Sequence, residues 1–371
     1  MTRRETALQE LSDNAGQIGS KMAMVGFDGF VDKIVHPVKQ RFGQGDHYER
    51  YDSIAEFGAK ISEAAGRSAN IEMYQILEKL GGNGPIMANA LHSARVNTRY
   101  IGALGKPTVH PVFEEFAKHT QAISISDPGV TTAAEFSDGK IMFGDMATLE
   151  AVDYHHIIDS MGEGAFLDLC SRADLIAMVN WTMLPNLSDL FNDLVDKVFP
   201  NFGPHENRHF FFDLADPAKR SQSDLRSVLR TITRFQAHGA VTLGLNLSEA
   251  AQVSQALDLG TVEDAEDSLK AAASRIRQEM NITCVVIHPM HSAACATRDG
   301  QWWIEGPYTA EPIITTGAGD HFNAGFMCAS LVGVSPLSCL HAAVCFSGFY
   351  VRSGKSPSMS DMTRFLSDWK D

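Results

Sequence analysis

Short apolar runs alternate along this chain with longer stretches in which apolar residues recur at helical spacing. The short runs, which are candidate buried strands, are Met22–Phe27, Arg99–Leu104, Leu175–Asn180, His209–Leu214, Ala240–Leu245 and Cys284–His288. The longer stretches that favour helices include Leu187–Phe199, Ser223–Gln236 and Glu263–Met280. This alternation predicts an α/β fold with a doubly wound, mostly parallel sheet that helices cover on both faces.

Two segments depart from the alternation. The stretch 33–76 is long and polar, and Thr131–Phe143 alternates between apolar and polar residues around an Asp138-Gly139 turn. That pattern predicts a β-hairpin, and a hairpin inside an α/β chain is not expected to join the parallel sheet. We therefore expect one domain over 20–371, with a small β-lid formed from parts of 33–76 and 125–146.

Polar side chains follow several of the predicted strands. In parallel sheets, ligands bind at the carboxyl ends of strands, so these side chains mark the expected site. They are Asp28, Asn180, Asp213, Asp216 and Asn246.

Charge and composition narrow the function classes. Asp and Glu (45) exceed Lys and Arg (31), which gives a net charge of −14 and argues against nucleic acid or an anionic membrane as partner. No apolar stretch is long enough to span a bilayer, and the first 21 residues lack the apolar core of a signal peptide. The six cysteines form no Cys-x-x-Cys pair, so a reducing cytoplasm is the expected location.

A loop of small residues leads into one carboxylate near the C-terminus. Thr315-Thr316-Gly317-Ala318-Gly319-Asp320 is followed by an apolar run with helical character. Such a loop lets backbone N–H groups converge on an anion at a helix N-terminus, and Asp320 would then stand beside a phosphate as a proton acceptor. Taken alone, the four residues Gly317 to Asp320 are equally compatible with an ordinary turn and an N-capping Asp.

The longer string, continued by His321-Phe322-Asn323-Ala324-Gly325-Phe326, resembles the C-terminal signature of the PfkB/ribokinase family of carbohydrate kinases. The resemblance implies a ribokinase-like fold, with ATP and Mg²⁺ as cofactors. It implies that Asp320 is the catalytic base and that the amides of Gly317, Ala318 and Gly319 form an anion hole. Asn323 falls where the family contacts the nucleotide.

Two further elements resemble the acceptor side of this family. Asp28 and Asp32 follow the first strand, and Gly82 and Asn83 belong to a Gly-rich entry to a helix. The resemblance implies that these four residues bind the acceptor, with Asp32 fitting the family spacing better than Asp28. From the residues alone, Asp28 starting a turn and Asp32 being solvated are equally good readings. A later Asn of the family is replaced by Ile86, so the identity of the acceptor cannot be inferred from a relative.

Asn246-Leu247-Ser248-Glu249 resembles the Asn-x-x-Glu element of the family, which implies phosphate binding by Asn246 and Glu249 and Mg²⁺ held by Glu249 through water. The local alternative is a capping box, with Asn246 as the cap and Glu249 three residues later. His288 is expected near the nucleotide, where relatives have a Thr-x-Gly loop. Ile314 replaces a polar residue that helps relatives to bind a monovalent cation, so activation by K⁺ is not expected.

Asp213 to Arg220 resembles the Asp-x-Asn-x-Arg strand end of the family. Arg220 has two open roles, which are contact with phosphate and an ion pair with Asp216.

Our main hypothesis is an ATP-dependent phosphotransferase that acts on a hydroxyl of a sugar or sugar-like molecule, with a homodimer as a possible assembly. One alternative is a nucleoside kinase, for which Phe30, Phe136 and Phe143 are candidate base-stacking residues. The other alternative is a non-catalytic sugar- or nucleotide-binding protein on a kinase scaffold.

Overall fold

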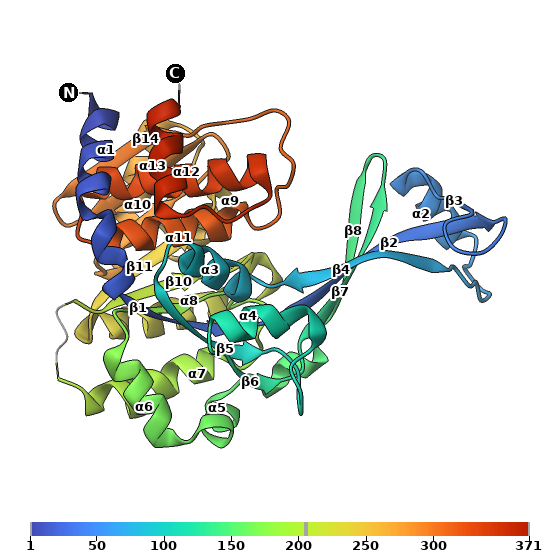
Figure 1. The fold of residues 1–371 in the computed structure, drawn as a ribbon, viewed down its shortest axis with the longest axis horizontal. Coiled ribbons are helices and arrows are strands. Elements are labelled where there is room, and N and C mark those ends of the chain that lie inside the picture. The colour runs from blue at the N-terminus through green and yellow to red at the C-terminus, as the bar shows by residue number, and fades with distance from the viewer. Residues whose placement is uncertain (1, 204–206, 370–371) are drawn as a thin grey trace.

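The main sheet carries the six predicted strands, all of which are confirmed. The computed structural model describes residues 2–203 and 207–369, and in this part of the chain the sheet has the order β14-β13-β12-β11-β10-β9-β1-β5-β6 (Figure 1). The strands from β12 to β6 are parallel, and β13 and β14 are antiparallel additions at one edge. Their bounds are β1 Met22–Phe27, β5 Asn97–Ala103, β6 Ile123–Ser126, β9 Leu175–Met178, β10 His209–Asp213, β11 Ala240–Leu245, β12 Cys284–Ile287, β13 Ser292–Thr297 and β14 Gly300–Glu305.

Helices cover both faces of this sheet, as the alternation predicted. Successive side chains of a strand point to opposite faces, so Phe210 and Phe212 enter one core and Phe211 enters the other. Into the core of Phe211 pack α1 Arg3–Asn14, α3 Asn83–Ser93, α4 Glu114–His119, α11 Ala318–Leu331, α12 Pro336–Ser353 and α13 Met359–Asp368. Into the other core pack α5 Tyr154–Met161, α6 Glu163–Arg172, α7 Leu187–Asp193, α8 Gln222–Arg234, α9 Leu247–Ala256 and α10 Glu266–Met280.

Helix α1 corrects the expected start of the domain. It lies beside α12 and α13, so the two ends of the chain meet at one side of the molecule (Figure 1). Leu11 and Ala7 are buried in the same core as the signature helix α11. The domain therefore begins before residue 20, because the apolar face of a polar-looking helix is needed to cover α12.

A second, smaller sheet projects away from the main sheet (Figure 1). The hairpin predicted around Asp138-Gly139 is present here and lies outside the main sheet. Helix α2 covers one face, where Phe57 and Phe136 pack with Val35. The elements are β2 Phe30–Arg41, β3 Tyr48–Arg50, α2 Ile54–Ser62, β4 Met73–Gly81, β7 Gly129–Phe136 and β8 Gly139–Asp145. We call these elements the lid sheet. None of the helices in the described part of the chain is both long and apolar enough to cross a membrane.

Candidate active site

The N-terminus of α11 carries the small-residue loop and Asp320. Gly317 is the N-cap and has φ of 92°, a left-handed conformation that a side chain would strain. A Cβ at Gly317 would also lie 3.1 Å from the Tyr350 hydroxyl and 3.2 Å from Ile86 Cγ2. The loop therefore needs Gly for both conformation and space. Its amides stand at the positive end of the helix, and that of Ala318 donates to the carbonyl of Thr315 at 3.2 Å.

Asp320 is buried in the first turn of α11, with 6% of its surface exposed. Burial raises the pKa of its carboxyl to about 8. The neighbouring Asp28 and Glu249 add to the rise in pKa, and a hydrogen bond from the Asn83 amide to Oδ1, 3.0 Å long, opposes it. A carboxylate with a raised pKa is a stronger proton acceptor, which suits a general base.

Two aromatic side chains that sequence reasoning missed hold the loop in place. The Tyr350 hydroxyl donates to the carbonyl of Thr316 at 2.9 Å, and His321 Nδ1 donates to the carbonyl of Gly317 at 2.7 Å. His321 Nε2 therefore accepts from the Ser356 hydroxyl at 2.9 Å, and its ring stacks on Tyr350 at 3.6 Å. The pKa of His321 is lowered by burial to about 4, so the ring is neutral.

Asp28 differs from the expected acceptor ligand, because it is fully buried and held by the protein itself. Its carboxylate accepts from the backbone N–H groups of Asn83 (2.9 Å) and Gly84 (2.8 Å) and from the side-chain amide of Asn180 (2.7 Å). Burial raises its pKa to about 6. Gly82, with φ of 101°, leaves room for this carboxylate. Asp28 thus caps α3 and holds the acceptor loop in place through the backbone of Asn83 and Gly84.

Of the predicted acceptor residues, Asp32, Gly82 and Asn83 keep accessible surface. Asp32 is the third residue of the lid strand β2, and it lies so close to Gly81 that a Cβ on Gly81 would come within 2.5 Å of the Asp32 carboxylate. Burial raises the pKa of Asp32, and the charges of Lys79 and Lys140 oppose that rise. Because 81–83 are consecutive and Asn83 bonds to Asp320, the predicted acceptor residues and the predicted base do come together.

At the start of α9, the local alternative for Asn246 and Glu249 is realised. Asn246 caps the helix, and Glu249 Oε2 accepts from the Asn246 backbone at 2.8 Å. Glu249 Oε1 accepts from the backbone of Asp216 at 3.0 Å. Burial raises the pKa of Glu249, and each carboxylate oxygen keeps a further lone pair.

Asp213 is a buried carboxylate of the site that we did not single out for a role. It ends β10, and its Oδ2 accepts from Asn323 Nδ2 at 3.0 Å. Its pKa is raised well above the usual value, first by burial and then by Glu249 and Asp320. Asp213 Oδ1 and Asn323 Oδ1 are among several buried polar atoms of the described residues that have no hydrogen-bond partner. Asn323, expected at the nucleotide, is itself buried and bound to Asp213.

The donor set fits a hydrated Mg²⁺ better than a directly coordinated ion. The described residues hold no group of three or more His, Cys, Asp or Glu side chains placed to bind a metal directly. Mg²⁺ prefers oxygen donors and keeps several waters, so unpartnered oxygens such as Asp213 Oδ1 are suitable for contact through water.

His288 and Arg220 differ in how far they match the sequence expectation. His288 lies over Phe322 at 4.6 Å and beside Gly319, with a buried, unpartnered Nε2. Burial lowers its pKa to about 4. Arg220 takes neither open role, because it donates to the carbonyls of Trp181, Thr182 and Leu184 and stacks on the Trp181 ring at 4.4 Å.

The candidate base-stacking residues do not form one surface. Phe30 and Phe136 are buried in separate cores, and only Phe143, on β8, is exposed. This arrangement gives no support to the nucleoside reading.

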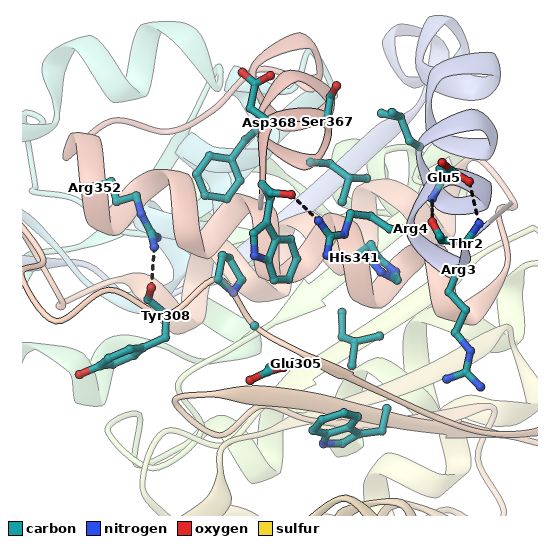
Figure 2. Close-up of a pocket in the computed structure, with 18 of the residues that line it drawn as sticks. Thr2, Arg3, Arg4, Glu5, Glu305, Tyr308, His341, Arg352, Ser367 and Asp368 are labelled. Atoms are coloured by element: carbon teal, nitrogen blue, oxygen red, sulfur yellow. Dashed lines mark hydrogen bonds between the residues drawn. The ribbon is translucent and has the colours of Figure 1, made fainter. Parts of the chain in front are cut away.

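A large groove lies elsewhere on the molecule, between the chain ends. It has a volume of about 1160 Å³ and is formed by α1, β14, α12 and α13 (Figure 2). Arg4 donates to the carbonyl of Trp369 at its rim, and Arg352 donates to the carbonyl of Tyr308. It contains none of the carboxylates described above, and its arginines are balanced by Glu5, Glu305 and other acids. The groove is therefore not the candidate active site.

The fold and this site define a carbohydrate kinase of the PfkB/ribokinase type. The solved structures that share the fold include ribokinase of Arabidopsis thaliana complexed with ribose and ATP, with a TM-score of 0.65, 14% identity and coverage of 94% of this chain and 99% of that chain. A carbohydrate kinase from Agrobacterium tumefaciens has a TM-score of 0.64 at 16% identity, covering 94% of this chain and 97% of the other.

The model of the prokaryotic ketohexokinase family matches residues 5–369, so the chain belongs to that family. A curated relative, the ketohexokinase of Haloferax volcanii, is 26% identical over 351 residues, which cover 94% of this chain and 91% of the relative.

Proposed function

We propose that this protein transfers a phosphoryl group from ATP to a hydroxyl of a ketohexose. The observation that carries the proposal is the Asn83–Asp320 hydrogen bond, which joins the acceptor loop to the carboxylate at the N-terminus of α11. The family match and the curated ketohexokinase relative support the choice of acceptor.

In the proposed reaction, Asp320 accepts the proton of the attacking hydroxyl. Its buried position favours the protonated product, and Asn83 Nδ2 orients the carboxylate toward the acceptor. The amides of Gly317, Ala318 and Gly319 stabilise negative charge on the transferring phosphoryl group, since that charge develops at the positive end of α11. The Ala318 amide would share its hydrogen between the phosphoryl group and the carbonyl of Thr315. Asp32 and Asn83 bind acceptor hydroxyls, while Asp28 positions α3. His288 and Asn323 line the side of α11 on which ATP, the phosphoryl donor, would bind.

Asp213 and Glu249 are the residues that would hold Mg²⁺ through water, with Asn246 placing Glu249. When bound, the ion neutralises charge on the donor phosphates. The acidic surface, net −14, is in keeping with a cytoplasmic enzyme that binds no nucleic acid.

A homodimer is also part of the proposal. A second copy would cover apolar side chains that the lid sheet leaves exposed, namely Met73, Ile76, Leu77, Met142 and Phe143. Light scattering at micromolar concentration measures the mass directly, and a strictly monomeric protein would contradict this part.

The test of the function is ADP release with MgATP and a panel of ketohexoses, aldoses, pentoses and nucleosides. We expect a ketohexose to give the highest kcat/KM. Turnover with a nucleoside only would favour the nucleoside kinase, and binding without turnover of any member would favour the non-catalytic alternative. Asp320→Asn should lower kcat by about 10²–10⁴-fold. The exposed Asp159→Asn is the matched control, and a fully active Asp320→Asn would show that another group is the base.

A further inference from the structure

One lysine of the lid sheet reaches the small-residue loop. Lys140 is the second residue of β8 and is exposed, and its Nζ donates to Thr316 Oγ1 at 3.4 Å. Thr316 directly precedes the N-cap Gly317, and its carbonyl is held by Tyr350. The Lys140 ammonium therefore lies near the amides at the N-terminus of α11, although Lys140 belongs to the lid sheet and α11 packs on the main sheet.

The same lysine also faces the acceptor side. Asp32 pairs with Thr131 across β2 and β7, and Glu135 pairs with Lys140 across β7 and β8. Thr131 and Glu135 are four residues apart on one strand, so they share a face, and their cross-strand partners Asp32 and Lys140 share it too. The charges of Lys79 and, to a lesser extent, Lys140 oppose the rise that burial causes in the pKa of Asp32. Lys140 thus shares a face of the lid sheet with Asp32 and also contacts the small-residue loop.

Another lysine of the lid sheet, Lys79, lies opposite Asp32 across β2 and β4 and acts on that carboxylate. Burial and then the charges of Glu249 and Asp320 raise the pKa of Asp213, and burial and then the charges of Asp28 and Glu249 raise that of Asp320. Arg220, the cation that the sequence offered for phosphate, is held by three backbone carbonyls and the Trp181 ring. In the described part of the chain, no ion pair involves Lys140. Its ammonium is therefore available to a ligand.

We propose that Lys140 contacts the phosphoryl group during transfer, so that the lid sheet supplies the positive charge that the main sheet lacks. Negative charge spreads over the equatorial oxygens of the phosphoryl group in the transition state. A cation carried by the lid sheet stabilises that charge. Because the lysine also faces Asp32, the contact forms best when acceptor and donor are both bound. The inference rests on the proposed phosphoryl transfer but not on the identity of the acceptor.

The test compares Lys140→Met, Lys140→Arg and a matched lid control, Lys39→Met. Lys39 is a lid lysine already paired with Glu49 and Glu56. We expect Lys140→Met to lower kcat by at least about tenfold. The loss should stay below the about 10³–10⁵-fold effect of an arginine finger, because Lys140 is exposed to solvent. Lys140→Arg should recover part of the loss. Both Lys140 variants should keep the wild-type melting temperature, since Lys140 makes no buried contact.

Binding of MgADP with and without aluminium fluoride, in the presence of the acceptor, separates a catalytic contact from a structural one. Aluminium fluoride mimics the transferring group, so the wild type should bind MgADP more tightly with it, and Lys140→Met should lose that gain while binding MgADP alone normally. A normal gain in Lys140→Met, or no gain in the wild type, would overturn the proposal. If ketohexoses are not turned over, the acceptor assignment fails, and the same comparison is run with whichever panel member is.

Discussion

At the residue scale, Asp320 combines a protected position with a carboxyl that resists ionisation. We predict that kcat/KM for the acceptor rises with pH and levels off above about pH 8, because the carboxyl must be deprotonated to accept a proton and burial raises its pKa to about 8. Asn83→Ala removes the hydrogen bond that lowers this pKa, so the rising limb should move to higher pH. The measurement is a pH profile of initial rates at subsaturating acceptor. A profile that is flat from pH 6 to 9 would contradict the assignment.

The two carboxylates after the first strand should respond differently to substitution. Asp28→Asn places an amide where Asn83, Gly84 and Asn180 all donate, so it should destabilise the fold by about 1–3 kcal/mol. Asp32→Asn should leave stability unchanged within about 0.5 kcal/mol and raise KM for the acceptor. Urea denaturation and steady-state kinetics on both variants provide the check. If Asp28→Asn raised KM and Asp32→Asn lowered stability instead, Asp28 would be the residue that contacts the acceptor.

The positions of site residues were predictable where a motif fixed them and unpredictable where packing did. Asp320 and Asn83 could be found from their Gly-rich loops, because backbone conformation there restricts the sequence. The holding of the loop by Tyr350 and His321 could not, since Tyr350 is 34 residues from the carbonyl it binds. Asp213 was visible as a strand-end carboxylate, but its link to Asn323 spans 110 residues.

At the element scale, the α11 loop is anchored through its backbone. The N–H of Ile313 donates to the carbonyl of Val351 at 2.8 Å, and that of Ile314 lies 3.5 Å from the same oxygen. Six strands of the main sheet and the helices α7, α8 and α10 were predictable from the pattern of apolar residues, whereas β6, β13 and β14 were not predicted. The lid sheet was only partly predictable, since its β2 and β4 carry exposed and half-buried residues in no simple alternation.

Potassium should stimulate this enzyme by no more than about twofold, because Ile314 offers no side-chain oxygen to a hard cation at the start of the loop. The measurement is the initial rate in Na⁺-free buffer, with K⁺ exchanged for an organic cation at constant ionic strength. Ile314→Asp is the companion variant, and gain of K⁺ dependence in it would show that the side chain decides. A large saturable rise in the wild type would mean that backbone carbonyls suffice.

At the scale of the whole molecule, the ends of the chain close one face of the fold. Glu10 of α1 accepts from the backbone N–H of Ser335 at 3.0 Å and from the Ser338 hydroxyl at 2.8 Å, which places a carboxylate at the N-terminus of α12. Leu11 packs into the core that also contains α11. This role of the first residues could not be predicted from their composition, because α1 is largely polar and its apolar face is narrow.

Leu11→Ala should therefore destabilise the protein by about 2–5 kcal/mol through the cavity it leaves. The same substitution should leave kcat of the folded enzyme near the wild-type value, because α1 packs mainly on α12 and α13, and it is α12 that packs on the signature helix α11. Gln9→Ala, an exposed position on the same helix, is the matched control and should change stability by less than about 0.5 kcal/mol. Guanidinium denaturation gives the free energy of unfolding, and assays well below the transition give kcat. Loss of kcat without loss of stability would mean that α1 acts on the site, and an unchanged free energy of unfolding would mean that α1 is dispensable for the fold.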